Sequence, residues 1–154
     1  KYLHSKRELI MDTEEFLKLL SDNHRLLILG GGLICFVSIF LPFIRIEEMY
    51  LDNVEISGIN APLSTTWMFW IFLIVIGGLY YAYFQNYGEK YQKIFLAIGG
   101  ILILMTLYAT QIYAGGDSQI SIAYGFFLEL IGSLAVTIGG YYYDINILNH
   151  LKSD

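Results

Sequence analysis

Four long apolar stretches constrain this chain more than any motif in it. The first lies between Arg25 and Arg45, where residues 26–44 read LLILGGGLICFVSIFLPFI and carry no charge. The others cover residues 67–84, 94–113 and 121–143. A helix needs about 20 mostly apolar residues to cross the hydrocarbon core of a bilayer. These lengths predict four transmembrane helices, in keeping with a composition that is 56% hydrophobic and only 15% charged.

Short connections between the spans limit what else the chain can hold. We expect an all-α membrane protein in which residues 1–154 form one membrane domain, a four-transmembrane-helix bundle without a separate catalytic domain. No phosphate-binding loop, nucleophile elbow or His-Glu-x-x-His motif occurs in the sequence, so we expect no enzyme and no cofactor. Cys35 is the only cysteine, which excludes a cysteine-based zinc site.

The distribution of positive residues predicts the orientation, because lysine and arginine stay on the cytoplasmic side during insertion. Arg45 alone falls in the loop 45–66. The other eight of the nine lie before the first span, between the second and third, or after the fourth: Lys1, Lys6, Arg7, Lys18, Arg25, Lys90, Lys93 and Lys152. Both termini and the loop 85–93 are therefore expected in the cytoplasm of a multi-pass protein of the cell membrane.

The loops 45–66 and 114–120 are expected outside, and they are acidic. Against Arg45 they hold five carboxylates: Glu47, Glu48, Asp52, Glu55 and Asp117. This surface either attracts cations or a basic partner, or it reflects only the exclusion of positive residues from translocated loops. No basic patch exceeds the cluster near the N-terminus, so nucleic-acid binding is not expected.

Two segments outside the spans show local patterns. In residues 1–24, Asp12 and Glu15 have the spacing of a helix N-cap, and an apolar stripe of Phe16, Leu17 and Leu20 follows. This predicts a short amphipathic helix that either lies at the headgroups or docks on a partner, or else merely continues the first span into the cytoplasm.

In the first outer loop, residues 45–51 and 54–59 flank Asp52-Asn53, a pair that tolerates the backbone of a tight turn. We expect a small β-hairpin there. Four spans with a structured first outer loop resemble the claudin arrangement in outline, a resemblance of architecture that implies no function.

Glycines recur in each span, and small side chains let helix backbones approach closely in lipid. Gly125, Gly132 and Gly139 are seven residues apart and predict one packing stripe on the fourth helix. A glycine pair followed by tyrosines, at 77–81 and 139–143, raises the alternative of a duplicated hairpin. The glycines that we expect to pack are Gly31, Gly32, Gly77, Gly78, Gly99, Gly100, Gly125, Gly132, Gly139 and Gly140.

Glu129 has the only carboxyl group within a predicted span. It lies four residues after Gly125 and three before Gly132, so it shares their helix face and is expected to point into the bundle. Burial disfavours its charged form. Uncharged groups at matching depth are its expected partners, namely Cys35, Ser38 and Thr106. Such a carboxyl either marks an ion or proton path or joins helices by a hydrogen bond.

These observations favour a non-enzymatic membrane protein that acts by association in the bilayer, as a homo-oligomer or as a small subunit of a membrane complex. A proton- or cation-coupled transporter or pore that uses Glu129 is the alternative. A further alternative is an immunity or defence protein that meets a toxin through the loop 45–66.

Overall fold

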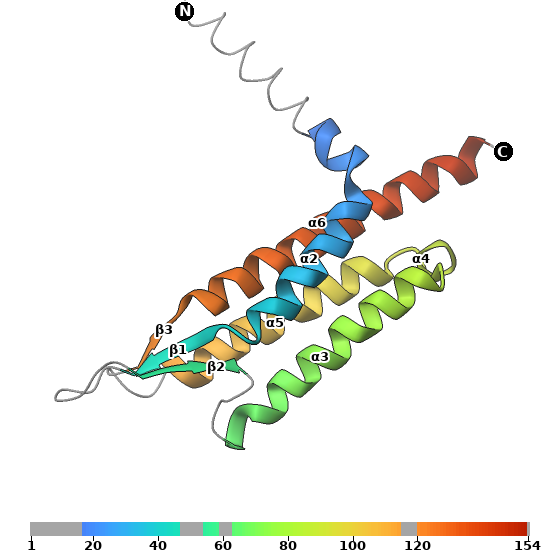
Figure 1. Ribbon diagram of the computed structural model, residues 1–154. Coiled ribbons are helices and arrows are strands. Elements are labelled where there is room, and N and C mark those ends of the chain that lie inside the picture. Colours follow the sequence, from blue (N-terminus) through green and yellow to red (C-terminus); the bar gives the residue numbers. More distant parts are fainter. Residues whose placement is uncertain (1–16, 47–53, 59–62, 115–119, 154) are drawn as a thin grey trace, which may run out of the picture.

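The fold is a bundle of long helices with a small sheet at one end. The computed structural model describes residues 17–46, 54–58, 63–114 and 120–153. Its helices are α2 (His24–Ser38), α3 (Leu63–Phe84), α4 (Tyr87–Lys90), α5 (Ile94–Ala114) and α6 (Tyr124–Ser153). The start of α2, the short α4 and the end of α6 lie at the end of the bundle opposite the sheet (Figure 1).

Helix α6 is central to the packing. It contacts α2 and α5 most extensively, while α3 packs mainly on α5 and less on α2. Buried side chains from all four long helices fill the interior. Near the sheet they include Phe43, Phe69 and Phe72, and towards the other end Ile28, Leu79 and Phe95. The buried core therefore runs along the whole bundle.

Two of the helices are long and apolar enough to cross a membrane, over Ile94–Ile112 in α5 and Tyr124–Asn146 in α6. The apolar segments His24–Ser38 and Met68–Phe84 are shorter. All four nevertheless carry large apolar side chains on their outer faces: Leu33, Ile74, Leu104 and Ile131 are 57%, 72%, 68% and 55% exposed.

The first apolar stretch is not helical throughout, which corrects the predicted span 26–44. Helix α2 ends at Ser38, and strand β1 (Pro42–Ile46) begins within the stretch. Proline lacks the backbone N–H that a helix requires and disfavours helical geometry at the preceding residue, here Leu41. The predicted span 121–143 is corrected at both ends. Residues 120–122 form a strand, so α6 begins only at Tyr124, and it continues ten residues beyond Tyr143 to Ser153.

The sheet has three antiparallel strands in the order β2-β1-β3. Strand β1 pairs with β2 (Val54–Ser57), with Arg45 opposite Glu55 and Ile46 opposite Val54. Antiparallel pairing in the first outer loop is thus confirmed, but β1 begins earlier than the predicted strand 45–51, and seven residues, 47–53, separate the paired strands instead of a two-residue turn. On its other edge β1 pairs with β3 (Ile120–Ile122), a strand that was not predicted. The expected turn at Asp52-Asn53 lies outside the described residues.

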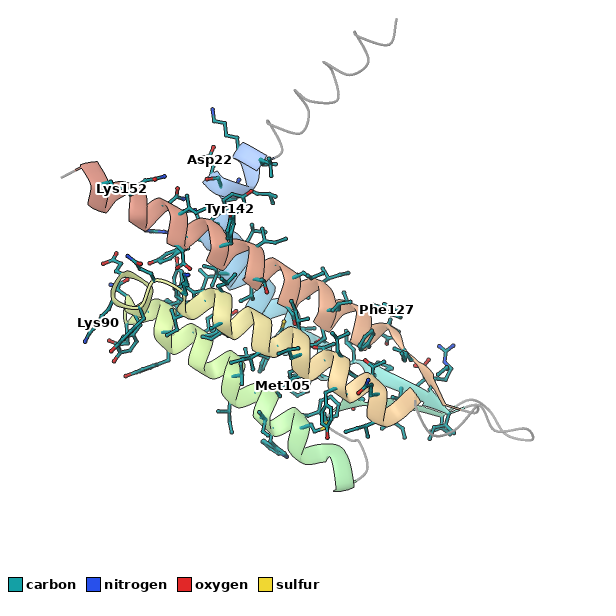
Figure 2. The ribbon with its side chains drawn as sticks, turned by 180° about the vertical axis from the view of Figure 1, so that it is seen from behind. Asp22, Lys90, Met105, Phe127, Tyr142 and Lys152 are labelled. Carbon is teal, nitrogen blue, oxygen red and sulfur yellow. The ribbon has the colours of Figure 1, made fainter. Side chains whose placement is uncertain are left out.

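Only part of the predicted N-terminal helix can be compared. Asp12, Glu15 and Phe16 lie outside the described residues, whereas residues 17–22 are helical. Figure 2 places Asp22, Lys90 and Lys152 at the end of the bundle opposite the sheet, and Phe127 close to the sheet.

Candidate functional site

Glu129 lies inside the contact between α2 and α6, and its side chain is fully buried. Its carboxyl oxygen Oε2 is hydrogen-bonded to Ser38 Oγ, which is also fully buried. The placement follows from sequence, because Glu129 shares a helix face with Gly125 and Gly132 and that face is turned towards α2. We call the contact line formed by Gly31, Cys35 and Ser38 on α2 with Glu129, Gly132 and Val136 on α6 the α2–α6 seam.

Counting hydrogens indicates how this pair is bonded. Ser38 Oγ lies 2.7 Å from the carbonyl oxygen of Cys35 in its own helix, one turn back. A hydroxyl has only one proton. When that proton is donated to Cys35, the contact with Glu129 needs a proton from the carboxyl group. The geometry therefore accommodates a neutral carboxylic acid that donates to Ser38.

The second carboxyl oxygen, Oε1, is buried and has no hydrogen-bond partner among the described residues. An unpaired buried oxygen is costly, and far more so when it carries charge. This oxygen thus also favours the neutral form of Glu129.

Cys35 lies beside the same carboxyl group. Its sulfur is 3.7 Å from the backbone oxygen of Glu129 and 3.7 Å from Ser133 Oγ. Ser133, in turn, donates to the backbone oxygen of Glu129 at 2.7 Å. The structure thus brings Cys35 and Ser38 together with Glu129 and adds Ser133. The signal for Ser133 was its position one helical turn after Glu129.

Thr106 was the third expected partner, and it bonds elsewhere. Its hydroxyl donates to the carbonyl oxygen of Leu102 at 2.7 Å within α5. Although Thr106 is fully buried, this internal bond satisfies its hydroxyl proton.

Glycines allow the two backbones of the seam to approach. A Cβ atom at Gly31 would lie 2.7 Å from the carbonyl oxygen of Gly132 and 2.9 Å from the backbone nitrogen of Val136. At Gly132 it would lie 2.7 Å from Cys35 Sγ. Gly125 and Gly139 make equally close approaches to Pro42 and His24. The stripe expected on the fourth helix therefore lies against α2 and the start of β1 along its whole length.

The remaining predicted glycines divide into two groups. Gly99 and Gly140 face the backbone across the contact of α5 with α6, and Gly32 faces Leu79 of α3. At Gly77, Gly78 and Gly100 no atom of the described chain lies within 4 Å of an added Cβ. The pair 77–78 and the pair 139–140 thus occupy different surroundings, and duplication of a hairpin stays a prediction.

Two cavities lie at the end opposite the sheet. One of about 460 Å³ is apolar and is bordered by Leu17, Leu20, Leu96, Thr137, Ile138, Tyr141 and Tyr142. The other, of about 190 Å³, is bordered by Arg25, Tyr83, Phe84, Asn86 and Tyr143. Neither cavity is bordered by Glu129.

The chemistry available at Glu129 is that of one carboxyl group with hydroxyl and thiol neighbours. Within the described residues, no three His, Cys, Asp or Glu side chains gather closely enough to hold a metal ion. Comparison with protein-family models, with curated proteins and with solved structures finds no match to this chain.

Proposed function

We propose that this chain is an integral membrane protein with four spans and cytoplasmic termini, and that it acts by association with protein in the bilayer. Its partner is a second copy or a larger membrane complex of which it is a small subunit. The observation that carries the proposal is the apolar outer surface. Leu33, Ile74, Leu104 and Ile131 show that each long helix exposes large apolar side chains. Such a surface requires lipid or another apolar partner to cover it.

The charges at the two ends support the orientation. Lys90 and Lys152 lie at the end where α2 begins and α6 finishes (Figure 2). At the sheet end, Arg45 forms an ion pair with Glu55, with Arg45 Nη2 2.6 Å from Glu55 Oε1. An inner location for the lysine-bearing end agrees with the preference of positive residues for the cytoplasm.

The shorter α2 is compatible with four spans. Its 15 residues extend for about 22 Å at a rise of 1.5 Å per residue. The apolar residues 39–44 continue from it into β1, so the stretch that crosses the hydrocarbon layer is part helix and part strand. Non-helical backbone is tolerated at membrane depth when it is buried in protein, and Phe43 and Ile44 are buried.

Association is favoured over transport because of how Glu129 is enclosed. The carboxyl group is fully buried in a seam where backbones touch at Gly31 and Gly132. A conducting path normally shows several polar groups along its length. The partners of Glu129 instead form one local cluster between two helices, an arrangement suited to joining them.

Cross-linking in native membranes tests the association. A photoreactive residue at Ile74, Leu104 or Ile131 faces outwards, and the same residue at Leu79, which is fully buried, is the matched control. We expect a cross-link to protein from at least one outer position and none from position 79. Lipid adducts alone at every outer position would contradict the proposal. Extraction of the chain by alkaline carbonate would contradict the membrane placement itself.

The unpartnered Oε1 is the observation that favours the transport alternative, because an added cation or water would satisfy it. Reconstitution in liposomes separates the two functions. Association predicts no ion or proton flux above that of empty liposomes. Flux that Glu129→Gln abolishes would establish the alternative. Half of the loop 45–66, on which an immunity function depends, lies outside the described residues, namely 47–53 and 59–62.

A further inference from the structure

The smaller cavity at the inner end collects hydrogen-bond donors from separate parts of the chain. Arg25 comes from the start of α2, Tyr83 from the end of α3, Asn86 from the turn before α4, and Tyr143 from α6. A guanidinium, two phenol hydroxyls and an amide can all donate. At about 190 Å³ the cavity is larger than one water molecule requires. Its lining is suited to a small group rich in acceptor oxygens.

Neighbouring contacts hold the Tyr143 ring in place, and the Asn86 side chain is free of a capping bond. The ring of Tyr143 packs edge-on against Phe95, with 5.1 Å between ring centroids, and against His24 at 5.6 Å. Asn86 has left-handed backbone geometry, with φ of 55° and ψ of 30°, and its side chain makes no capping bond to α4. The phenol is thus oriented by its packing, and the Asn86 amide is not used to cap the helix that follows it.

The charges around the cavity are mixed. Arg25 is the only charged residue that borders it. Arg25 and the carboxylates Glu89 and Asp144 all lie close enough to the Tyr143 hydroxyl to act on it electrostatically, and Lys93 acts on Asp144. Arg25 and Lys93 balance the two carboxylates, so the surroundings match a singly charged phosphodiester held by the Arg25 guanidinium better than a multiply charged anion.

The cavity adjoins the exposed aromatic surface at the end of α3. Phe84, which borders the cavity, is 71% exposed, and Tyr81 one turn earlier is 60% exposed. A ligand held here by its acceptor oxygens has an apolar surface beside it on which hydrocarbon can lie. Phospholipids combine these two properties, and aromatic side chains at this depth are typical of the membrane interface.

We propose that the cavity bordered by Arg25, Tyr83, Phe84, Asn86 and Tyr143 binds the phosphodiester of a phospholipid from the leaflet that faces the chain termini. The acyl chains then lie along the outer face of α3. This inference rests on the membrane placement proposed above. It adds a specific lipid contact, so the protein can be membrane-embedded without it.

Native mass spectrometry of the full chain in detergent tests this binding. The probes are a phosphatidylglycerol, a phosphatidylethanolamine and a diacylglycerol with the same acyl chains, and inorganic phosphate serves as competitor. Arg25→Gln removes the charge and Tyr143→Phe removes one hydroxyl while keeping the ring. Lys152→Gln is the matched control, since Lys152 is an exposed cation at the same end.

We expect both phospholipids to bind, and diacylglycerol to bind at least tenfold more weakly. Arg25→Gln should weaken phospholipid binding about tenfold, as expected for loss of a hydrogen bond to a charged group. Tyr143→Phe should weaken it several-fold, and Lys152→Gln should not change it. Melting temperatures of the variants show whether each is folded, and Arg25→Lys, which keeps the charge, should recover part of the binding.

Equal binding by wild type and Arg25→Gln would overturn the inference, as would diacylglycerol that binds as well as the phospholipids. Displacement of lipid by millimolar phosphate would assign the cavity to a free anion. If alkaline carbonate extracts the chain from membranes, the proposed membrane placement is wrong. If the chain stays in the membrane but its lipid binding does not depend on Arg25, only the proposed phospholipid site is wrong.

Discussion

Replacing Gly31 with alanine tests how closely α2 and α6 approach, and Gly30 provides a matched control beside it. The new methyl carbon at position 31 would lie 2.7 Å and 2.9 Å from backbone atoms of Gly132 and Val136. Ordinary contact begins at about 3.4 Å, so the helices must separate by roughly 0.7 Å. At position 30, one residue earlier in the same helix, nothing lies within 4 Å.

The magnitude follows from comparing the two variants. Both replace a helical glycine with alanine, which favours the helix by about 1 kcal/mol in each case. This gain cancels in the comparison and leaves the overpacking cost, about 1–3 kcal/mol. We therefore expect Gly30→Ala to be neutral or slightly stabilising. Gly31→Ala should be less stable than Gly30→Ala by about 1–3 kcal/mol, because its obstacles are backbone atoms that cannot rotate away.

The assay is thermal unfolding of the purified protein in one mild detergent, followed by circular dichroism. At about 3 °C per kcal/mol for a chain of this size, Gly31→Ala should melt about 3–9 °C below Gly30→Ala. Equal melting temperatures for the two variants would refute the close α2–α6 seam. Gly31→Ala combined with Gly132→Ala should be non-additive, because the two positions are in contact.

Five further substitutions, at three positions, give distinct outcomes in the same unfolding assay. Glu129→Gln keeps a donor for Ser38 and should change stability by less than about 1 kcal/mol, whereas Glu129→Ala should cost about 2–3 kcal/mol through the lost interhelical bond and the cavity; a severe effect of Glu129→Gln would argue against the neutral carboxyl. Asn86→Val should cost about 1–2 kcal/mol because of its left-handed backbone, and Asn86→Gly should not; equal effects would contradict that conformation. Arg45→Gln should cost less than about 1 kcal/mol, because its ion pair with Glu55 is exposed, and a larger loss would show that the pair is coupled to the rest of the sheet.

Hydropathy predicted the position of the helices well and their ends less well. It located α3, α5 and α6 because their apolar stretches are long. It failed at residues 39–44, since an apolar run has the same hydropathy in a helix and in a strand. Pro42 was the available signal for that boundary. It also ended the fourth helix at Tyr143, although no glycine or proline interrupts residues 144–153 and the helix continues through them.

The sheet shows a different limit of sequence reasoning. The β1–β2 pairing is local, and two short runs separated by turn-forming residues predicted that it forms. They did not predict its register, because Ile46 lies opposite Val54 and leaves seven residues between the strands. Strand β3 has only three residues and pairs with a strand more than 70 residues earlier. It pairs with β1 only because α5 and α6 bring the loop 114–120 next to the loop 45–66, and no local sequence pattern predicts that.

At the candidate site, helical spacing predicted which way Glu129 faces, whereas depth in the membrane was a less selective guide to its partners. The glycines spaced seven residues apart predicted that the Glu129 side chain faces another helix, and in the structure that helix is α2. Matching by depth proposed Ser38 and Thr106 alike, but Thr106 is on α5 and satisfies its hydroxyl within its own helix. The cavity around Arg25 had no sequence signal, because its residues come from parts of the chain that only the packed bundle brings together.

The orientation of the bundle in a membrane is tested most directly by cysteine labelling in intact cells. Cys35 is the only native cysteine and is fully buried, so the unaltered chain gives the background. Val54→Cys places an exposed thiol at the sheet, and Lys90→Cys and Lys152→Cys place one at the opposite end. A membrane-impermeant maleimide should label position 54 in intact cells, and positions 90 and 152 only after permeabilisation. Equal labelling of both ends in intact cells would contradict a bundle that spans the membrane.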